Sequence, residues 1–494
     1  MHVRVWRVLP AVGVVTVAGL ILSPVSAVSG EQPGYRRLVE LEGARTFSDE
    51  LTAALVSGDA RKAGRAALAL GRTEDPRAAG PLKNATAAPD VSLRALAVYG
   101  YGLLAAHTPL ETKVVIARLA DRAGVVRVAA IDAAWRSEAA ANPGAAALDG
   151  PLLRLLDGDA DPIVRARAAT ALSAWRDDRG IAAVCSAVGR SFGRERDRTV
   201  RWHEAWALRR ACARFETPAA VRAGLADRDE LVRIQFADIV ARRKAQSGIA
   251  QLHPLLGDPS WRVREQAYES IKVLAGLSNT DHLGAIPAEV ATPSPAPVNT
   301  EPALPRPASR GKRPTKPVAT QARLDLALRP ATSREMDGPM PGLHPRVRIG
   351  TTKGPIVVRL YPEWAPLTVA NFLNLAGRGY YDHLRWFRIV PDFVVQTGDP
   401  HDNGEGDAGY TIPAEENPLE QRAGVISMGL NYTQGAKPGP IRDSAGTQFY
   451  ITISPQLHLN RDFTVFGEVE SGFATLGRLV ESDRMTRVER LADD

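Results

Sequence analysis

Cysteine is nearly absent from this chain of 494 residues, which contains only Cys185 and Cys212. Two cysteines without a matching histidine pattern do not supply the ligand set of a structural zinc site, and the sequence predicts neither a metal nor a cofactor. The pair is compatible with one disulfide in an oxidising compartment or with two buried thiols on neighbouring helices. Because a bridge depends on a Cα separation that sequence does not supply, both interpretations stay open.

Strong charge of either sign is lacking as well. The 62 Lys and Arg residues against 55 Asp and Glu give a formal net charge of +7, which is carried mostly by scattered arginines, so nucleic-acid binding is not predicted. A hydrophobic fraction of 45% with 24% charged residues is typical of soluble globular protein and excludes wholesale disorder and a multi-span membrane protein. The length exceeds one hydrophobic core and predicts several domains.

The only long apolar run lies at the N-terminus. Arg4 and Arg7 precede apolar residues from Val8 to Leu22, and small residues follow up to Ala27. This pattern predicts a cleaved signal peptide over residues 1–27, because the run is shorter than the roughly 20 residues of a spanning helix. We therefore expect bacterial export to the periplasm or the medium, without stable membrane insertion after cleavage. An uncleaved anchor is the alternative.

Residues 45–285 repeat one theme about seven times, with a period of roughly 31 to 38 residues. Each copy has a turn with Asp or Pro, then Val-Arg or a similar pair, and then Ala-rich apolar spacing of the helical type. One helix pair cannot bury its apolar stripe alone, whereas a stack of pairs can. The sequence therefore predicts an α-solenoid, and the pattern resembles HEAT repeats.

Arginine recurs at one position of successive copies. Its stem can pack along apolar surface while its guanidinium bonds an aspartate in the turn of the adjacent repeat, so we expect a ladder that ties repeats together. A charged binding groove is the alternative, and we expect the array to bind a protein partner. The ladder residues are Arg94, Arg127, Arg165, Arg201, Arg233 and Arg264, and the tryptophans expected in the array core are Trp135, Trp202, Trp206 and Trp261.

Residues 286–343 are rich in proline and show no apolar period. Such a composition predicts a linker with extended polyproline geometry. We expect this linker to hold two domains apart and to let them fold independently.

From Arg346 the pattern changes to short alternating strands separated by glycine turns. Four strings follow in order: DHLRWFRIVPDFVVQTGDP from Asp382, GVISMG from Gly424, AGTQFYITIS from Ala445 and TVFGEV from Thr464. Together they resemble the cyclophilin family of peptidyl-prolyl cis/trans isomerases over residues 344–485. The resemblance implies a closed, eight-stranded antiparallel β-barrel with two capping helices. The whole chain is then multidomain, an all-α solenoid followed by this barrel.

An isomerase of this kind acts on proline-containing polypeptides by rotating an X-Pro amide over a barrier near 18–20 kcal/mol. As the amide twists, its nitrogen pyramidalises and becomes a hydrogen-bond acceptor, so a permanently charged donor stabilises the twisted state most. The resemblance implies that Arg388 is this donor and that Gln396 donates to the carbonyl before proline. Phe393 completes the catalytic set as part of the proline pocket. A non-catalytic scaffold that grips proline segments is the alternative.

The resemblance also implies residues that line the proline pocket or contact the substrate backbone. The loop 431–444 is longer than the family's usual connection and borders the groove, so we expect it to alter which peptides fit. Asp399 is explained by a Gly-Asp-Pro turn, and Phe387, Phe449 and Phe466 are expected in the barrel core. The implied substrate-binding residues are Val394, Gly429, Leu430, Gln448, Tyr450, His458, Leu459 and Phe463.

Overall fold

The computed structural model describes residues 33–173, 181–214, 218–277, 329–330, 344–433 and 439–492. The expected signal peptide and nearly all of the expected linker lie outside these residues. Within them, no helix has both the length and the apolar character needed to cross a membrane. The chain packs as two compact units, one made of residues up to Trp175 together with Pro330 onward, and the other spanning Arg176–Arg329.

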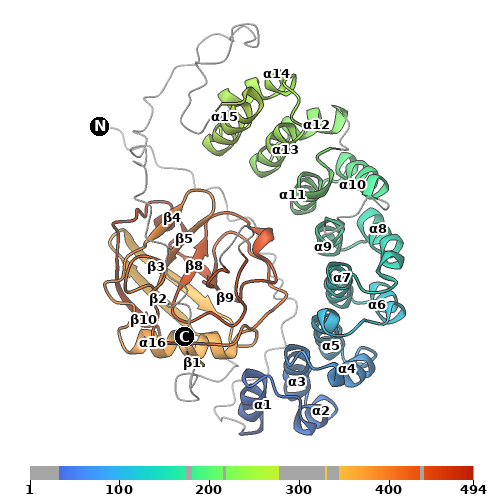
Figure 1. Ribbon diagram of the computed structural model, residues 1–494, viewed down its shortest axis with the longest axis vertical. Helices are drawn as coiled ribbons and strands as arrows, with labels where there is room; N and C mark the ends of the chain where they lie inside the picture. The colour runs from blue at the N-terminus through green and yellow to red at the C-terminus, as the bar shows by residue number, and fades with distance from the viewer. Residues whose placement is uncertain are drawn as a thin grey trace. The chain divides into compact units, whose positions relative to one another are not determined.

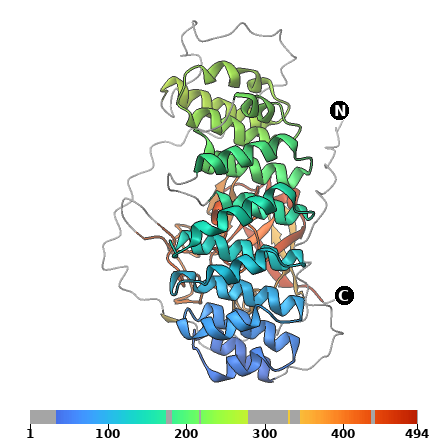
Figure 2. The same ribbon diagram turned by 90° about the vertical axis from the view of Figure 1, so that its right-hand side faces the viewer.

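The helices of the first unit that precede Trp175, α1 to α9, are called the proximal helices. Aspartates begin several of them, because the side chains of Asp59, Asp90 and Asp161 accept hydrogen bonds from the first turn of α3, α5 and α9. Helices α3, α5, α7 and α9 pack against one another in this order (Figure 2). The elements are α1 (Pro33–Gly43), α2 (Asp49–Leu55), α3 (Ala60–Arg72), η2 (Pro76–Ala78), α4 (Ala79–Ala85), α5 (Val91–Leu103), η3 (Leu104–Ala106), α6 (Thr112–Leu119), α7 (Gly124–Ala139), η4 (Ala145–Leu148), α8 (Asp149–Gly158) and α9 (Pro162–Leu172).

The second unit is helical too, and in it Cys185 and Cys212 form a disulfide with a Cα–Cα distance of 5.3 Å. Of the two open interpretations, the bridge is therefore the one observed. Trp202 and Trp206 are buried as expected, whereas the prediction for Trp261 is wrong, since 54% of it is exposed at the start of α15. The elements are α10 (Ile181–Arg194), α11 (Arg198–Ala207), η5 (Leu208–Cys212), α12 (Pro218–Leu225), α13 (Glu230–Arg242), α14 (Gly248–Leu252), η6 (His253–Gly257) and α15 (Trp261–Ala275).

The arginine ladder recurs in both units. Each of the six arginines donates to the main-chain carbonyl six residues earlier, at 2.6–3.0 Å, so all occupy one structural position. The expected bond to an aspartate of the following turn is confirmed for four of them. The pairs are Arg94 with Asp121, Arg127 with Asp159, Arg201 with Asp227, and Arg233 with Asp258.

Residues 344–492 of the first unit, called the strand domain, form a curled antiparallel sheet of eight strands in the order β10-β2-β3-β9-β7-β8-β5-β4 (Figure 1). An isolated bridge between Arg385 and Arg484 joins the two ends of this order. The expected combination of a helical region and a curled antiparallel sheet is confirmed. The elements are β2 (Arg346–Thr351), β3 (Gly354–Leu360), α16 (Pro366–Gly377), β4 (Arg388–Val390), β5 (Val394–Thr397), β6 (Tyr410–Thr411), β7 (Val425–Met428), β8 (Phe449–Thr452), η9 (Leu457–Leu459), β9 (Val465–Ser471), α17 (Phe473–Leu476) and β10 (Met485–Arg490), with β1 (Arg329–Pro330) paired to β6.

The core of the strand domain lies between the sheet and α16. Phe449 and Phe466 are fully buried there, as expected, and Phe372 of α16 contacts both rings. The prediction for Phe387 is wrong, because that side chain is only half-buried and Trp386 occupies the core instead. Successive side chains of an extended segment point to opposite sides, and the sequence does not fix which of the two aromatic residues faces inward.

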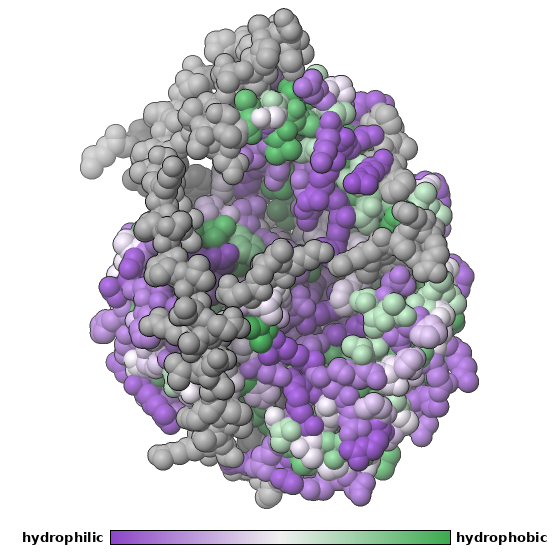
Figure 3. Space-filling view, viewed as in Figure 1, coloured by the Kyte–Doolittle hydropathy of each residue, from purple (hydrophilic) through white to green (hydrophobic). Residues whose placement is uncertain are grey.

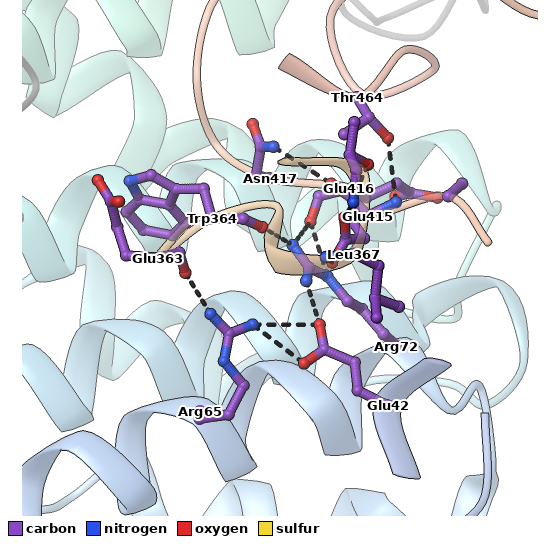
Figure 4. A network of polar contacts seen from close by, with 12 residues as sticks. Glu42, Arg65, Arg72, Glu363, Trp364, Leu367, Glu415, Glu416, Asn417 and Thr464 are labelled. Carbon is purple, nitrogen blue, oxygen red and sulfur yellow. Dashed lines mark hydrogen bonds and ion pairs between the residues drawn. The ribbon is translucent and has the colours of Figure 1, made fainter. Parts of the chain in front are cut away.

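The proximal helices pack directly against the strand domain through a buried polar network (Figure 4). The carboxylate of Glu42 on α1 accepts hydrogen bonds from Arg65 and Arg72 of α3. Arg65 also donates to the carbonyl of Glu363, and Arg72 donates to the carbonyl of Trp364 at 2.9 Å. The expectation that the two domains are held apart is therefore wrong for residues 33–173.

On the face drawn in Figure 3, hydrophilic residues predominate and hydrophobic residues lie in small separate groups. The large hydrophobic side chains that are exposed in the described chain are scattered over both units. They are Val56, Trp261, Val273, Tyr432, Phe473 and Val480.

Candidate active site

A small apolar cluster lies apart from the main core of the strand domain. Four of its members are more than nine-tenths buried, and Phe393 and Leu430 pack against them while staying partly exposed. The members come from β5, β8, η9 and the segment before β9, which are distant in sequence. The four buried residues are Val394, Tyr450, Leu459 and Phe463. Six of the residues predicted from sequence thus meet in one apolar cluster.

Aromatic rings fix the shape of this cluster. The Phe393 ring stacks on the exposed His458 with centroids 5.7 Å apart and an interplanar angle of 14°. Tyr450 meets Phe463 edge-on at 5.8 Å. The guanidinium of Arg388 lies 5.4 Å from the centre of the Phe393 ring, which places a permanent cation at the rim of an apolar surface.

A chain of side-chain hydrogen bonds runs along the other side of Arg388. Arg388 on β4 and Gln396 on β5 are direct cross-strand partners, and Arg388 Nη1 donates to Gln396 Oε1 at 3.2 Å. Gln396 Nε2 donates to Gln448 Oε1 at 3.1 Å. Gln448 Nε2 in turn donates to the carbonyls of Gly404 and Gly406 at 3.1 and 3.0 Å. The guanidinium is therefore oriented by a series of bonds that ends on main-chain carbonyls.

Gly429, directly after β7, lies close to two residues of this chain of amides. A Cβ at Gly429 would lie 3.2 Å from Gln448 Cβ and 3.3 Å from Gln396 Nε2. The Gly429 N–H donates to the Gln448 carbonyl at 2.7 Å, which holds the two segments together. The next residue, Leu430, packs on the apolar cluster. Gly429 thus serves the site by leaving room for both amides.

Asp399 organises the loop that receives Gln448. Its buried carboxylate accepts the N–H groups of His401 and Asn403 at 2.7 and 2.9 Å and that of Gly404. A Cβ at Gly406 would lie 1.9 Å from Asp399 Oδ1, so only glycine fits there. Asp399 therefore has the turn role expected from the sequence, and its loop presents the two carbonyls that fix Gln448.

Tyr450 is a buried member of the apolar cluster and carries a hydroxyl group. Burial raises the pKa of its hydroxyl well above the usual range, so the group stays protonated at any physiological pH. Among the described residues no group of three or more His, Cys, Asp or Glu is arranged to hold a metal ion. Arg388 supplies a permanent positive charge beside the apolar cluster.

The long loop 431–444 reaches the edge of the cluster with its described residues. Tyr432 pairs with Pro440 in an isolated bridge, and the Ile441 N–H donates to the Asn431 carbonyl at 2.7 Å. The Tyr432 ring lies 6.4 Å from that of Phe463 and is 45% exposed. Tyr432 was not among the predicted site residues, because it lies in the part of the loop that the motifs do not cover.

The strand domain matches known proteins. Residues 346–492 match the family described as cyclophilin type peptidyl-prolyl cis-trans isomerase/CLD. Over 135 residues the chain is 45% identical to peptidyl-prolyl cis-trans isomerase B of Bacillus subtilis, which covers 27% of this chain and 88% of that protein. It is 38% identical over 145 residues to a peptidyl-prolyl cis-trans isomerase of Synechococcus elongatus, covering 29% and 94%. A cyclophilin type isomerase of Cryptosporidium parvum, known as a crystal structure, is 28% identical over 31% of this chain and 99% of that chain, with a TM-score of 0.28.

Proposed function

The chain belongs to the family of cyclophilin-type peptidyl-prolyl cis-trans isomerases, and from this premise we propose that Arg388, Phe393 and Gln396 carry its catalysis. The observation that supports this assignment is the position of Arg388 between an apolar cluster and an ordered chain of amides. A proline ring requires the apolar surface, and the adjacent amide requires the donors. Both are supplied within one site.

The proposed mechanism needs no bond to be broken in the main chain of the substrate. The proline ring packs on Phe393, Leu459 and Phe463, which brings the X-Pro amide next to the guanidinium. As the amide leaves planarity, its nitrogen gains a lone pair that accepts an N–H of Arg388. Because the planar isomers have no such acceptor, the hydrogen bond is strongest in the twisted state and lowers the barrier.

Gln396 has two roles in this mechanism. Its Oε1 accepts from Arg388 and keeps the guanidinium in place, while one hydrogen of Nε2 is directed at Gln448. The second hydrogen of Nε2 is the donor that we assign to the carbonyl preceding proline. While Gln396 holds that carbonyl, the rotation about the amide bond moves the proline side of the bond relative to the carbonyl.

Exchange spectroscopy by nuclear magnetic resonance tests this function against the scaffold alternative. A short peptide with one X-Pro bond shows separate cis and trans signals, because uncatalysed exchange takes tens of seconds or longer. An isomerase gives exchange cross-peaks at catalytic protein concentration. A protein that only grips proline segments shifts the signals through binding and gives no exchange, and this result would contradict the assignment.

We further propose that residues 45–285 form HEAT-like repeats that bind protein clients or a protein partner. The support is the recurrence of one arginine position six times in the helical region. Such an array would raise the local concentration of client at the isomerase site. The test compares the full chain with a variant in which residues 181–277 are removed: peptide turnover should be equal, and refolding of a proline-limited protein should be slower with the variant. Equal refolding rates would remove this proposal.

Export is likewise proposed, and two features support it. The signal pattern of residues 1–27 predicts cleavage after Ala27, and the disulfide between Cys185 and Cys212 suits an oxidising compartment. The exported protein would then assist the folding of proline-containing clients outside the cytoplasm. Mass spectrometry of the protein recovered from a bacterial periplasm or culture medium should give an N-terminus close to residue 28. An intact N-terminus in the cytosolic fraction would contradict export.

A further inference from the structure

A segment of the pocket wall is held from outside the strand domain. Arg461 lies between Leu459 and Phe463, two members of the apolar cluster. Its Nε donates to Asp132 Oδ1 at 2.6 Å, and its guanidinium lies 4.0 Å from the centre of the Trp135 ring. Both partners belong to α7, one of the proximal helices. The wall segment is thus tied to the helical region by an ion pair and a cation–π contact.

The backbone of this wall segment is in an unfavourable conformation. Arg461 has φ of 74°, a left-handed value that residues with a Cβ seldom adopt without support. Strained backbone of this kind is unfavourable and persists where surrounding contacts determine it. The contacts of the Arg461 side chain to α7 are suited to supply that support.

Asp132 is built to stay charged and fixed in direction. Its Oδ1 accepts from Arg461 and its Oδ2 from Arg136 at 2.8 Å, with only 10% of the side chain exposed. Burial by itself raises the pKa of Asp132, but the charges of Arg461 and Arg136 outweigh it and hold the pKa well below the usual range. The carboxylate is therefore ionised at neutral pH, and each of its oxygens has one arginine.

Ion pairs also join the proximal helices to the base of the long loop 431–444. Asp443 has φ of 61° and its carboxylate accepts from Arg45 at 2.6 Å, just after α1. The neighbouring Arg442 pairs with Glu74, which follows α3, and with Glu416 at 3.1 Å. The proximal helices thus fix the base of the loop whose Tyr432 ring approaches Phe463.

A third contact links α9 to a segment that bonds the main chain of Phe463. Arg167 of α9 pairs with Glu420 at 3.0 Å and donates to the Pro418 carbonyl at 2.9 Å. The next residue, Gln421, is buried, donates through Nε2 to the carbonyl of Phe463 at 3.4 Å, and accepts from Ser427. Of the three contacts, the first ends close to Phe463 in sequence, the second ends at the base of the loop that carries Tyr432, and the third ends next to Gln421, which bonds the Phe463 carbonyl.

We propose that the proximal helices set the shape of the proline pocket, with Asp132 as a positioning residue that acts on Leu459 and Phe463 through Arg461. The inference rests on the isomerase function proposed above and extends it to residues outside the strand domain. The catalytic donors lie on β4 and β5 and are held by strand register and by Gln448. Loss of the Asp132 contact should therefore weaken substrate binding and leave the barrier of the bound substrate nearly unchanged.

The test uses the full chain with the substitution Asp132→Asn, which keeps the size of the side chain and removes its charge. We expect KM for a proline peptide to rise about five- to tenfold, with kcat within about twofold of the unchanged protein. The dissociation constant of the same peptide, measured by calorimetry, should rise in parallel.

The matched control is Asp121→Asn. Asp121 is similarly buried and bonds Arg94, Arg118 and the Ala123 N–H, all within the proximal helices. This control should lower the unfolding temperature and leave KM unchanged. A KM of Asp132→Asn within twofold of the unchanged protein, or an equal rise in the control, would overturn the proposal.

Two further variants keep the test decisive if Asp132→Asn folds poorly. Arg461→Ala should raise KM as much as Asp132→Asn, and the double variant should raise it no further, since both remove one contact. Trp135→Leu removes the cation–π contact, keeps the ion pair and should give a smaller rise. If the rise in KM of the double variant equals the product of the two single rises, the proposal is contradicted. A chain without exchange activity would contradict the isomerase function instead, while the calorimetric comparison would still test the pocket.

Discussion

Arg388 and Gln396 face each other across the β4–β5 pair, and the guanidinium Nη1 donates to the amide Oε1 at 3.2 Å. This bond helps to set the direction of the Arg388 guanidinium, because Gln396 is itself fixed by Gln448 and the loop carbonyls beyond it. The edge of the apolar cluster thus carries a charged donor that contacts an uncharged amide. The group that Gln396 offers to this guanidinium is a neutral amide oxygen.

Replacing that neutral partner by a carboxylate should impair catalysis. In Gln396→Glu the new charge would draw Arg388 into an ion pair and repel the substrate carbonyl, so kcat/KM should fall about 10²-fold. Gln396→Ala, which lacks the charge, should be less impaired. A peptide isomerisation assay measures both variants, and a Gln396→Glu variant more active than Gln396→Ala would contradict this account of the bond.

The space beside Gly429 should be equally sensitive. In Gly429→Ala the added Cβ meets Gln448 and Gln396 Nε2 at 3.2–3.3 Å, so the amides must shift by a few tenths of an ångström, and kcat/KM should fall about tenfold. Gly377→Ala is the matched control, since a Cβ there meets nothing within 4 Å. Equal activity of the two variants would show that the amides adjust without cost.

The disulfide should stabilise the second unit alone. It closes a loop with a sequence separation of 27 residues, for which removal typically costs about 3 kcal/mol of unfolding free energy. In calorimetry, the double substitution of Cys185 and Cys212 by alanine should lower the unfolding temperature of that unit. Peptide turnover should be unchanged. A loss of turnover would contradict the view that the disulfide stabilises the second unit without affecting the isomerase site.

The ion pair of Asp132 leads to a defined pH dependence. Its folded-state pKa lies well below the unfolded value near 3.9, so folding favours the ionised form. The stabilisation is complete above about pH 5 and is lost as the pH falls further. The difference in unfolding free energy between the unchanged protein and Asp132→Asn, measured with urea, should therefore shrink below about pH 4. A difference at pH 2 as large as the difference at pH 7 would show that the charge of Asp132 is not its source.

Much of the site was predictable because the motifs fix local chemistry. The string from Trp386 to Gln396 places the arginine, the aromatic residue and the amide on two short paired strands, and the structure brings them together. Which of Trp386 and Phe387, just before β4, points into the core was not predictable. Both side chains are large and aromatic, and packing alone decides which one turns inward.

The support of the pocket by the helices was not predictable either. Asp132 and Arg461 are separated by 329 positions, and each is flanked by ordinary helical or loop sequence. An aspartate within a helix gives no sign of its tertiary partner. The proline-rich composition before residue 344 also suggested separated domains, whereas packing between distant segments depends on surfaces that composition does not describe.

The most direct measurement of the central claim is the catalytic efficiency of Arg388→Ala in the full chain. Charged donors placed for a transition state are typically worth about 2.7–4 kcal/mol, so kcat/KM should fall roughly 10²–10³-fold. The peptide dissociation constant should change little, because the apolar cluster remains, and Arg388→Lys should recover only part of the activity. Near-unchanged kcat/KM in a folded Arg388→Ala protein would contradict the proposed role of the guanidinium at the proline nitrogen.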